Sequence, residues 1–596
     1  MCGIVGYAGA RKAQPILLDC LKRLEYRGYD SAGMAVISGD LQLFKSEGEI
    51  ARLESGMPEM KGELGIAHTR WATQGKPTTE NAHPLADCSN KLAVVHNGII
   101  SNFMELRESL IKSGHKFSSE TDTEVFAHMV EAEFDGDLLS AVRKALSHIE
   151  GTYAFAVVAA GKDEIVVARC ESPLVVGLGT GENFVASDVT ALLKYTNKMI
   201  YLKDGEVARI TKDSVMILDN AGAEVRREPQ KVDWSVEDAE KGGYAHFMLK
   251  EIFEQPEAIH ESLLGRIESL SSETFFDGRD FSSVKIVACG TSFHAGLVGK
   301  YIIEEIAKTP TTCQISSEYR YSSAPRENPL VVLVTQSGET LDTMAAAREA
   351  KKRGHKTVAI ANVMGSAITR EVDHTIYTRA GPEIGVAATK TFTTQVIAMY
   401  LLAMDLGLQT RALNAQARRA VIGELRNLPR HVQDVLNKAS EIDALAQKYH
   451  SARDMFFIGR NINYPIALEG ALKTKEISYI HGEGFPAGEM KHGPLALFSK
   501  DSPVIAIAMK DHTYEKMLGN IGEVSARGSP VIAIGVEGDS ELEKYADEVI
   551  RIMDVPPVFS PIPVIVVLQL WAYYLAKHRG CPIDKPRNIA KTVTVE

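Results

Sequence analysis

Two patterns of apolar residues divide the sequence. Residues 1–232 alternate short β-rich runs with glycine-containing turns, as in GIVGYAG, GMAVIS, ELGIAHT, KLAVVHNG, TYAFAVVA, EIVVARC and PLVVGLG. Helical stretches are few there, and the clearest are Gln14–Leu24 and Thr123–Phe134. Strands at this spacing predict a layered α+β domain dominated by antiparallel sheets.

The pattern changes after the polar stretch REPQKVDWSVEDAEKGGYAH, which is typical of a linker. Apolar strands are followed there by long helical runs, first KIVACG, LVVLVTQSG and KTVAIAN, and later MFFIGRN, PVIAIAMK and PVIAIGVEGD. Continuous Val/Ile runs between helices predict parallel strands covered on both faces. We therefore expect two doubly wound α/β units, joined by a helical connector. They form a degenerate duplication whose first strands begin near Val284 and Met455.

A chain of 596 residues is too long for one hydrophobic core, and these patterns divide it into five predicted segments. The α+β domain covers residues 1–232 and is followed by a linker over 233–248. The two doubly wound units cover 249–425 and 426–582. Residues 583–596 form a C-terminal tail.

Composition excludes several classes of function. A formal charge of -11 gives no electrostatic footprint for nucleic acid. The N-terminus has no signal-peptide pattern, and the most apolar segment, VIVVLQLWAYYLA, is too short to span a membrane. The scattered cysteines form no CxxC pair or disulfide framework, so we expect a cytoplasmic protein without a membrane partner. They are Cys2, Cys20, Cys88, Cys170, Cys289, Cys313 and Cys581.

The second residue is a candidate nucleophile. Removal of Met1 would leave Cys2 with a thiol beside its own α-amine. The two groups have ordinary pKa values of about 8.5 and about 7.7–8.0, so a proton passes between them at little cost. Position 2 alone also fits an ordinary small apolar cysteine.

Three further stretches offer groups that such a nucleophile needs. VVHNGII places Asn97 and Gly98 just after a strand, where two N–H donors stabilise an oxyanion by about 3–4 kcal/mol. The alternative is a hairpin turn, which Asn-Gly commonly forms. Arg70 in HTRWATQG suits an amino acid's α-carboxylate, and Asp122 in SETDTE suits its α-ammonium. Each alone also fits a surface ion pair.

Taken together, MCGIVGY, EYRGYDSAG, HTRWAT, HPL, HNG and ETDTE resemble, in order, the glutaminase domain of the N-terminal-nucleophile (class II) glutamine amidotransferases. The resemblance implies an N-terminal-nucleophile hydrolase fold in which Cys2 attacks the side-chain amide of glutamine. It implies an oxyanion hole at Asn97 and Gly98, with Arg70 and Asp122 holding the amino acid.

The same resemblance assigns four further residues of this domain. Thr73 assists glutamine binding, Arg27 and Tyr29 lie in a glutamine loop, and Trp71 gates ammonia. Gln74 stands where members of the family often have histidine, which leaves its role in glutamine binding open.

The second half offers an anion site. After the strand LVVLVT comes QSGET and then a helical run. Hydroxyls and free N–H groups at a helix N-terminus suit phosphate, although Ser and Thr also cap helices without a ligand. Together with CGTS, this run resembles the phosphosugar-binding motif of sugar isomerase (SIS) domains, with Thr335 where serine is common. The residues that the resemblance assigns to the sugar phosphate are Thr291, Ser292, Thr335, Gln336, Ser337, Thr340 and Val386.

Ionisable side chains gather in the second doubly wound unit. Glu469, Lys473 and Glu476 are spaced by four and three residues, which places them on one helical face. A solvated, salt-bridged face is the usual explanation. The helix leads into HGEGFPAGEMKHGPLAL, a stretch that we interpret as a functional glycine-rich loop carrying His492.

The tail PIDKPRNIAKTVTVE resembles the closing segment of the glutamine:fructose-6-phosphate aminotransferase (isomerizing) family, and the resemblance extends over the whole chain. It implies a two-part enzyme that makes glucosamine 6-phosphate for amino sugar synthesis and passes ammonia through an internal channel. Lys591 would form an imine with the open-chain ketose, and Glu476 would move a proton from C1 to C2. His492 would open the sugar ring, and Lys473 would support these groups.

The family acts as homodimers in which that histidine reaches the other subunit's site. An exposed lysine amine is almost wholly protonated at neutral pH, so imine chemistry predicts a tail buried in the sugar site.

Other functions fit the sequence less well. The sequence contains neither the acidic strand end and glycine-threonine loop of phosphoribosyl acceptors nor the SGGxDS loop of synthetases. A deglycase-like aminosugar enzyme generally lacks the glutaminase domain. A non-catalytic sugar-phosphate sensor usually carries a basic DNA-binding helix-turn-helix. We expect no cofactor, because the chemistry needs none, and the sequence has no metal-ligand spacing.

Overall fold

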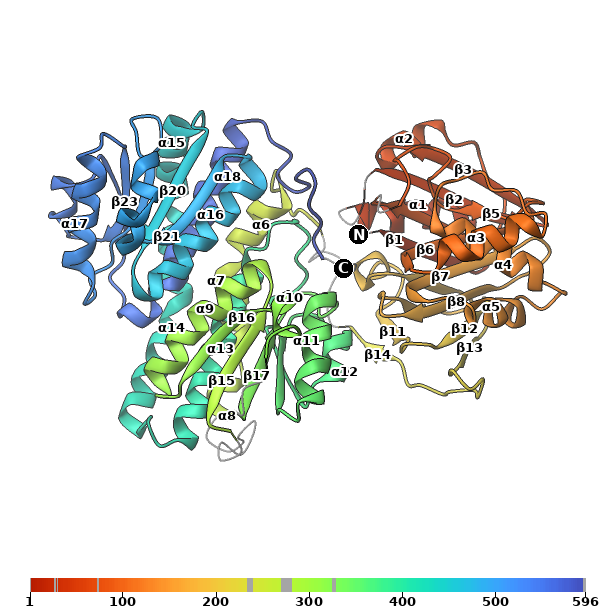
Figure 1. The fold of residues 1–596 in the computed structure, drawn as a ribbon, viewed down its shortest axis with the longest axis horizontal. Helices are drawn as coiled ribbons and strands as arrows, with labels where there is room; N and C mark the ends of the chain where they lie inside the picture. Colours follow the sequence, from red (N-terminus) through yellow and green to blue (C-terminus); the bar gives the residue numbers. More distant parts are fainter. Residues whose placement is uncertain are drawn as a thin grey trace. The chain divides into compact units, whose positions relative to one another are not determined.

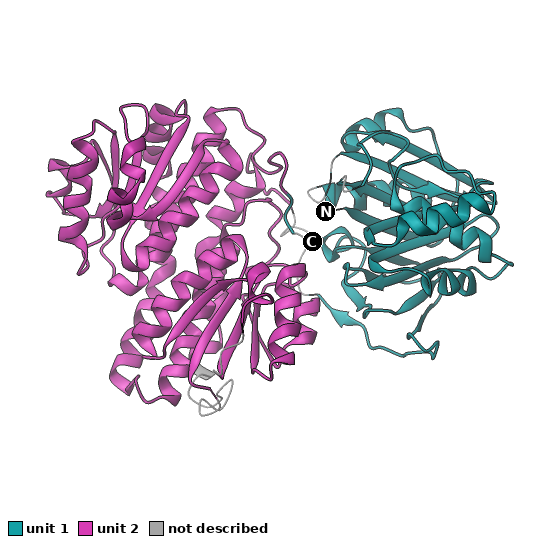
Figure 2. Ribbon diagram, in the orientation of Figure 1, with its two compact units in different colours: residues 1–239, 590–596 teal, residues 240–589 magenta. Residues whose placement is uncertain are grey.

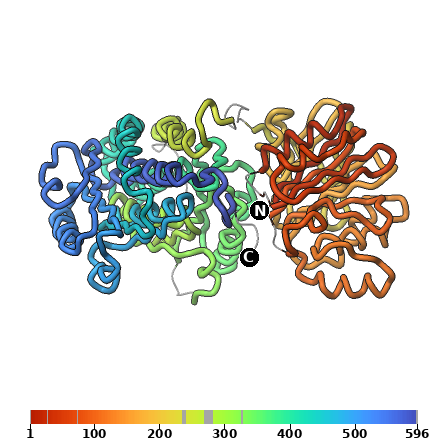
Figure 3. The backbone as a smooth tube through the Cα atoms, turned by 90° about the horizontal axis from the view of Figure 1, so that it is seen from above, coloured from red at the N-terminus to blue at the C-terminus, as the bar shows by residue number. Residues whose placement is uncertain are grey.

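The computed structural model describes residues 2–25, 28, 30–71, 74–232, 240–269, 281–323 and 328–592 (Figure 1). The chain groups into two compact units (Figures 2 and 3). Unit 1 comprises residues 1–239 and 590–596, and unit 2 comprises residues 240–589. Each unit is described by itself below.

Unit 1 contains two β-sheets whose described strand pairs are all antiparallel. In spatial order the larger sheet comprises β14 (Gln230–Lys231), β11 (Lys198–Tyr201), β9 (Val175–Leu178), β10 (Asn183–Ala186), β1 (Gly3–Ala8), β4 (Leu64–Arg70), β2 (Ser31–Ser38) and β3 (Asp40–Glu47). The smaller sheet comprises β13 (Val215–Leu218), β12 (Val207–Ile210), β8 (Ile165–Cys170), β7 (Gly151–Ala159), β6 (Leu92–Ile100) and β5 (Leu85–Ala86).

The two sheets of unit 1 pack face to face between helices. Along β6, Ala93 and Val95 enter the core between the sheets, whereas Leu92 and Val94 enter the core beneath the helices. This is the period-two alternation of a strand buried on both faces. The helices α1 (Ala13–Arg23) and α2 (Ile50–Gly56) contact the larger sheet. The smaller sheet is covered by α3 (Phe103–Lys112), α4 (Asp122–Glu133) and α5 (Leu138–Leu146). The predicted layered α+β architecture is confirmed.

Unit 2 contains two five-stranded parallel sheets with the same strand order. The first comprises β16 (Thr311–Ile315), β15 (Ser283–Ala288), β17 (Pro329–Val334), β18 (Thr357–Ala361) and β19 (His374–Tyr377). The second comprises β21 (His481–Pro486), β20 (Asp454–Gly459), β22 (Val504–Ile507), β23 (Val531–Val536) and β24 (Glu548–Ile552). Both follow the order 2-1-3-4-5, so the predicted duplication is confirmed at the level of topology.

Helices cover both faces of these parallel sheets. One hydrophobic core joins the two halves of unit 2 through α9 (Gly290–Ile306), α13 (Lys390–Gln409), α16 (Tyr464–Ser478) and α18 (Pro561–His578). The opposite face of the first sheet packs on α11 (Leu341–Lys352) and α12 (Ala367–Glu371), and that of the second packs on α17 (Tyr514–Ser525). The remaining helices are α6 (Phe247–Phe253), α7 (Gln255–Leu263), α8 (Arg266–Ser269), α10 (Ser316–Tyr319), α14 (Ala415–Asn437) and α15 (Ala439–Tyr449).

Within the described part of the chain, two segments are long and apolar enough to cross a membrane, Lys390–Gln409 and Pro557–His578. In each, 94% of the apolar window is buried inside the protein. Both belong to the core of unit 2, because their all-round apolar character matches burial against both halves. The expectation that the segment VIVVLQLWAYYLA is too short to span a membrane is wrong on length, because it lies within the longer segment Pro557–His578.

Candidate functional site

The Cys2 thiol lies immediately before β1, beside the end of β4 in unit 1. Its Sγ accepts a hydrogen bond from the Trp71 backbone N–H at 3.2 Å and lies 3.5 Å from the Trp71 carbonyl. Burial raises the pKa of the Cys2 thiol, and the bond from Trp71 and the charge of Arg70 partly oppose this rise. The thiol therefore needs a base before it can act as a nucleophile.

The Asn97 amide points at the residue that carries this thiol. Asn97 Nδ2 donates to the Cys2 carbonyl at 3.0 Å. Asn97 and Gly98 lie inside β6, opposite Ala154 and Tyr153 of β7. The expected position just after a strand is therefore wrong, and so is the alternative hairpin turn. Long-range pairing with β7 overrides the local turn preference of Asn-Gly.

Gly98 is a position that only glycine fits. Its φ is +133°, and an added Cβ would lie 2.0 Å from the Thr152 carbonyl oxygen. Such a backbone is strained for any L side chain. Glycine at this position thus allows β6 and β7 to approach closely, next to the Asn97 amide that faces Cys2.

A buried histidine fixes the orientation of Asn97. His68 Nε2 lies 3.0 Å from Asn97 Oδ1 and 3.1 Å from the His96 carbonyl. Both are acceptors, so Nε2 carries the proton. Burial lowers the pKa of His68 to about 3, which keeps the ring neutral. With Oδ1 accepting from His68, the amide nitrogen is left to face Cys2. Sequence reasoning missed this residue, although it stands in the HTRWAT motif.

The two residues predicted to hold glutamine are both buried in unit 1. The Arg70 guanidinium donates to the carbonyls of Gln74 and, at 3.3 Å, of Lys76 and Gly75. Asp122 begins α4, and its Oδ2 accepts from the Ile100 N–H at 2.9 Å. Gln74 thus contributes its backbone carbonyl to holding Arg70. Arg27, Tyr29 and Thr73 lie outside the described residues.

The predicted phosphate-binding loops follow the carboxyl ends of two neighbouring inner strands of the first parallel sheet. Thr291 and Ser292 lie in the first turn of α9, which follows β15, and residues 335–340 connect β17 to α11. β15 and β17 are neighbours, and the strand order runs outward from them in opposite directions. This is the topological switch point, where open α/β sheets bind ligands beyond the carboxyl ends of their strands.

The loop after β17 is held in one shape. Gly338 has a φ of +70°, and an added Cβ would lie 2.0 Å from Ser366 Oγ. Thr335 Oγ1 accepts from the Gly338 N–H at 3.3 Å and lies 3.2 Å from Thr340 Oγ1. Thr340 is the N-cap of α11, yet its side chain makes no capping hydrogen bond. The phosphate site at this loop stays a prediction.

The charged residues of α16 are buried. Glu469 and Lys473 are fully buried, whereas the Glu476 side chain is 21% exposed. Lys473 Nζ contacts Glu476 Oε2 and lies 3.5 Å from Glu469 Oε1. Burial lowers the pKa of Lys473, but the two carboxylates outweigh it and the net pKa is raised, so the ammonium stays charged. The alternative of a solvated, salt-bridged face is therefore wrong, because α16 packs against α18 and β21.

Glu469 links the two halves of unit 2. Its Oε1 accepts from Thr291 Oγ1 at 3.0 Å, and its Oε2 lies 2.7 Å from His294 Nδ1. Thr291 and His294 both come from the first turns of α9. The fold thus joins the charges of α16 to the switch point of the first sheet. Sequence reasoning missed His294, which only the folded chain brings to α16.

Comparison with known proteins also finds two kinds of domain in this chain. A glutamine amidotransferase domain model matches residues 68–194, and a SIS domain model matches residues 280–405 and 448–579. A glutamine–fructose-6-phosphate aminotransferase (isomerizing) of Methanosarcina mazei is 50% identical over 100% of both chains. Enzymes of the same name from Thermus thermophilus and Aquifex aeolicus are also 50% identical over 100% of both chains. This chain belongs to the glutamine–fructose-6-phosphate aminotransferase family.

Solved structures add the fold of the second half. The C-terminal domain of glucosamine-fructose-6-phosphate aminotransferase from Francisella tularensis is 38% identical, with a TM-score of 0.55, covering 58% of this chain and 99% of that chain. A putative phosphosugar isomerase from Silicibacter pomeroyi is 29% identical, with a TM-score of 0.50, covering 57% and 99% respectively. The family therefore combines an antiparallel glutamine amidotransferase domain with parallel-sheet SIS domains.

Two further residues are expected in the sugar site of the aminotransferase, His492 and Lys591. His492 ends a short 3-10 helix (Ala487–His492) and is exposed. The stretch interpreted as a loop begins instead with β21, the edge strand of its sheet. Lys591 lies in residues 590–596, which group with unit 1, so its place in the sugar site stays a prediction.

The start of the C-terminal tail is anchored within unit 2. Asp584 accepts from the backbone N–H groups of Phe247 and Met248, and its carbonyl accepts from the Val386 N–H at 3.2 Å. The Arg587 N–H donates to the Tyr479 hydroxyl at 2.8 Å. Val386 is thus tied through its backbone to the segment that leads into Lys591.

Proposed function

We propose that this chain converts fructose 6-phosphate and glutamine into glucosamine 6-phosphate and glutamate. The observation that carries the proposal is full-length similarity, at 50% identity over 100% of both chains, to relatives named for this reaction. The proposed segments are a glutaminase domain over 1–232, a linker over 233–248, SIS domains over 249–425 and 426–582, and a catalytic tail over 583–596.

Glutamine cleavage is proposed at Cys2 after removal of Met1. The α-amine takes the thiol proton, and the sulfur attacks the side-chain amide carbon. The carbonyl oxygen becomes an oxyanion held by Asn97 Nδ2 and the Gly98 N–H. The C–N bond then breaks, the proton goes to the leaving ammonia, and water hydrolyses the thioester to glutamate. The contact from Asn97 Nδ2 to the Cys2 carbonyl supports this assignment, because it brings a donor to the nucleophilic residue.

Binding of the amino acid is proposed for the charged residues around this thiol. Arg70 would take the α-carboxylate and Asp122 the α-ammonium, which requires Arg70 to exchange loop carbonyls for ligand oxygens. Thr73, Arg27 and Tyr29 would complete the pocket. Trp71, whose backbone contacts Cys2, would gate the passage of ammonia.

Sugar conversion is proposed at the first sheet's switch point and α16. The phosphate would be held by hydroxyls and N–H groups of both loops. Glu476 is the partly exposed end of a buried charge chain, which suits a carboxylate that moves a proton from C1 to C2 while Lys473 positions it. Lys591 would form the imine that ammonia displaces. The phosphate ligands would be Thr291, Ser292, Thr335, Gln336, Ser337, Thr340 and Val386.

A cytoplasmic homodimer is the proposed working form. His492, the proposed ring-opening residue, is exposed, and Leu497 beyond it is 58% exposed. Exposed groups on one segment suit contact with a second subunit. If the histidine acts across subunits, mixing inactive His492→Ala and Glu476→Ala chains yields hybrid dimers with one intact site. Recovery of activity on mixing supports this arrangement, and none on formation of the hybrid contradicts it.

Separate disabling of the two sites tests the function. Cys2→Ala should abolish glutamine-dependent formation of glucosamine 6-phosphate and retain formation from added ammonia. Lys591→Ala should stop sugar conversion from either nitrogen source and retain hydrolysis of glutamine. The readouts are glutamate and glucosamine 6-phosphate, measured together. Equal loss of both products in both variants contradicts two separate sites.

A further inference from the structure

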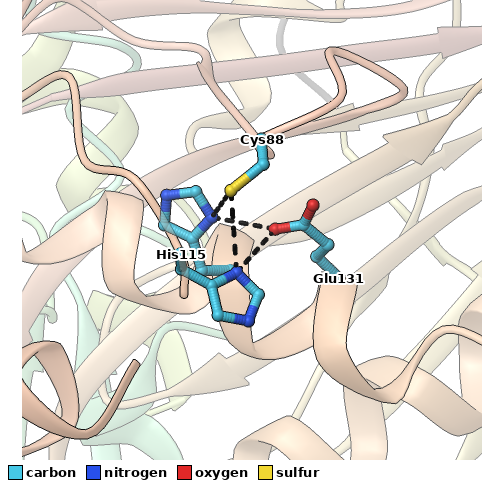
Figure 4. A group of neighbouring side chains, drawn as sticks. Cys88, His115 and Glu131 are labelled. Carbon is cyan, nitrogen blue, oxygen red and sulfur yellow. Dashed lines mark hydrogen bonds and ion pairs between the residues drawn. The ribbon is translucent and has the colours of Figure 1, made fainter. Parts of the chain in front are cut away.

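Four potential metal ligands of unit 1 lie close together, and none of them is assigned to the proposed glutamine site. Cys88, His115, His128 and Glu131 each direct one donor atom to a common point, and these atoms all lie within 4.8 Å of one another. Figure 4 shows the sulfur of Cys88, the ring of His115 and the carboxylate of Glu131 turned toward that point. The residues come from three segments of the chain, so their spacing along the sequence does not reveal the group.

The two sulfur–nitrogen separations match those around a tetrahedral zinc ion. Cys88 Sγ lies 3.7 Å from His115 Nδ1 and 3.6 Å from His128 Nδ1. With Zn–S of about 2.3 Å and Zn–N of about 2.0–2.1 Å, tetrahedral ligands lie about 3.5 Å apart. Glu131 Oε2 lies 2.9 Å and 3.0 Å from the same two nitrogens. These are slightly shorter than a zinc-bound pair and need only a small outward shift of one carboxylate.

The local backbone structure positions each of the four potential ligands near the others. Asp87 Oδ1 accepts from the N–H groups of Lys91 and Leu92 and so shapes the loop that carries Cys88. His115 follows α3 through Gly114, whose φ of +100° turns the chain back toward α4. His128 and Glu131 are three residues apart on α4, which places them on one helical face.

Hydrogen bonding alone explains the arrangement of these four side chains poorly. Both imidazole Nδ1 atoms contact the same carboxylate oxygen, and the same two atoms face one thiol. As hydrogen bonds, these contacts require both Nδ1 atoms to be protonated and to donate to one carboxylate oxygen beside the thiol. A single cation replaces those protons, because neutral imidazole nitrogens, a thiolate and a carboxylate all present lone pairs to it.

The surroundings also resemble the outer shell of a metal site. The far nitrogen of His128, Nε2, is buried and lies 3.7 Å from Glu124 Oε1. Glu124 is itself fixed by the N–H groups of Ser118 and Ser119. A carboxylate behind the imidazole orients metal-bound histidine in many proteins. The Lys116 N–H donates to Cys88 Sγ at 3.4 Å, which suits a charged sulfur.

We propose that Cys88, His115, His128 and Glu131 bind one Zn²⁺ ion in a closed, four-coordinate structural site. Binding releases the thiol proton of Cys88 to solvent, and the two imidazoles enter neutral. The ion would tie the β5–β6 loop and the segment after α3 to α4. Four protein ligands leave no open position for substrate, so the site would stabilise the glutaminase domain and take no part in the reaction.

Cobalt(II) provides a direct test, because it takes the same geometry and is coloured. The full-length Cys2→Ser variant is used, since the Cys2 thiol is a competing ligand. After treatment with a chelator, Co²⁺ is titrated while visible absorption and the thiolate-to-cobalt band are recorded. We expect one ion per chain with a tetrahedral spectrum and displacement by Zn²⁺. Adding Cys88→Ser should remove the thiolate band, Glu124→Gln should weaken binding about tenfold, and Cys170→Ser should change neither.

Thermal unfolding gives an independent readout. Zn²⁺ should raise the midpoint for the Cys2→Ser chain and leave it unchanged once Cys88→Ser is added. Glu131→Gln, which keeps the size of the side chain, serves if Cys88→Ser fails to fold. The proposal is overturned if Cys2→Ser binds no Co²⁺ at stoichiometric concentrations. It is equally overturned if Cys88→Ser and Glu131→Gln retain the same spectrum and stoichiometry.

Discussion

At the scale of single residues, the glutaminase centre depends on the orientation of one amide. Asn97 faces Cys2 with its nitrogen while its oxygen accepts a hydrogen bond from another group. The Nε2–H of His68 donates that hydrogen bond at 3.0 Å, and burial lowers the pKa of His68 to about 3. His68 is therefore neutral at any pH at which the enzyme works. We propose that it is a positioning residue, because it would act on the reaction through Asn97.

Replacing His68 should slow glutamine hydrolysis and leave glutamine binding nearly unchanged. His68→Ala removes the donor to Asn97 Oδ1, so the amide is free to turn, and we expect kcat to fall about 100-fold with KM within about twofold. His68→Gln retains an N–H donor near the same position and should recover much of the rate. Ammonia-dependent sugar conversion is the control and should persist. Parallel losses of kcat in the alanine and glutamine variants would contradict a positioning role.

At the scale of elements, α16 carries three charges through the core of unit 2. Lys473 is fully buried between Glu469 and Glu476, and no part of its side chain reaches water. A buried ion network of this kind adds little net stability when complete. It destabilises strongly when one partner is removed, because the remaining charges stay buried.

Lys473→Ala should therefore lower the free energy of unfolding of unit 2 by about 3–5 kcal/mol. Lys475 provides a matched control, because it lies on the same helix with its side chain exposed. Lys475→Ala should change stability by less than about 0.5 kcal/mol. Denaturant unfolding of both variants measures the difference. Similar small effects for the two lysines would show that the charges are not a coupled buried network.

The loop after β17 is a second element, and the proposed phosphate site depends on its shape. Gly338→Ala would place a Cβ 2.0 Å from Ser366 Oγ, so the loop must shift. We expect the KM for fructose 6-phosphate to rise at least about tenfold. Gly354→Ala is the matched control, since its φ of +80° imposes similar backbone strain and no atom lies within 4 Å of the added Cβ. A KM raised equally by both substitutions would mean that general strain, and not the phosphate loop, is responsible.

Elements were predictable where one local pattern dominated. Continuous apolar runs predicted β15 and β20 at the places where the structure has them, and they predicted the duplication. The strand order comes from the structure alone. Asn97 and Gly98 were misplaced, because Asn-Gly favours turns and their strand pairing depends on β7, more than fifty residues later in sequence. The burial of Lys473 depends on α18, and the cysteine–histidine cluster depends on three separate segments. Such features come from tertiary packing, which no local pattern encodes.

At the scale of the whole molecule, glutamine hydrolysis and sugar amination share one chain because ammonia, their common intermediate, is easily lost. Ammonia released into water is protonated and no longer a nucleophile. Passing it to the sugar site without contact with solvent retains its reactivity. The family architecture, a glutamine amidotransferase domain followed by SIS domains, supplies both ends of such a transfer. The central claim is therefore that nitrogen moves from the glutamine amide to the sugar inside the protein.

Isotope transfer in the presence of competing ammonium tests that claim most directly. The enzyme is given fructose 6-phosphate, glutamine labelled with ¹⁵N in its amide, and a large excess of unlabelled ammonium at neutral pH. Mass spectrometry then measures the ¹⁵N fraction in glucosamine 6-phosphate. The account predicts product carrying the label almost undiluted. Product labelled only in proportion to the mixed ammonia pool, or no glucosamine 6-phosphate at all, would contradict it.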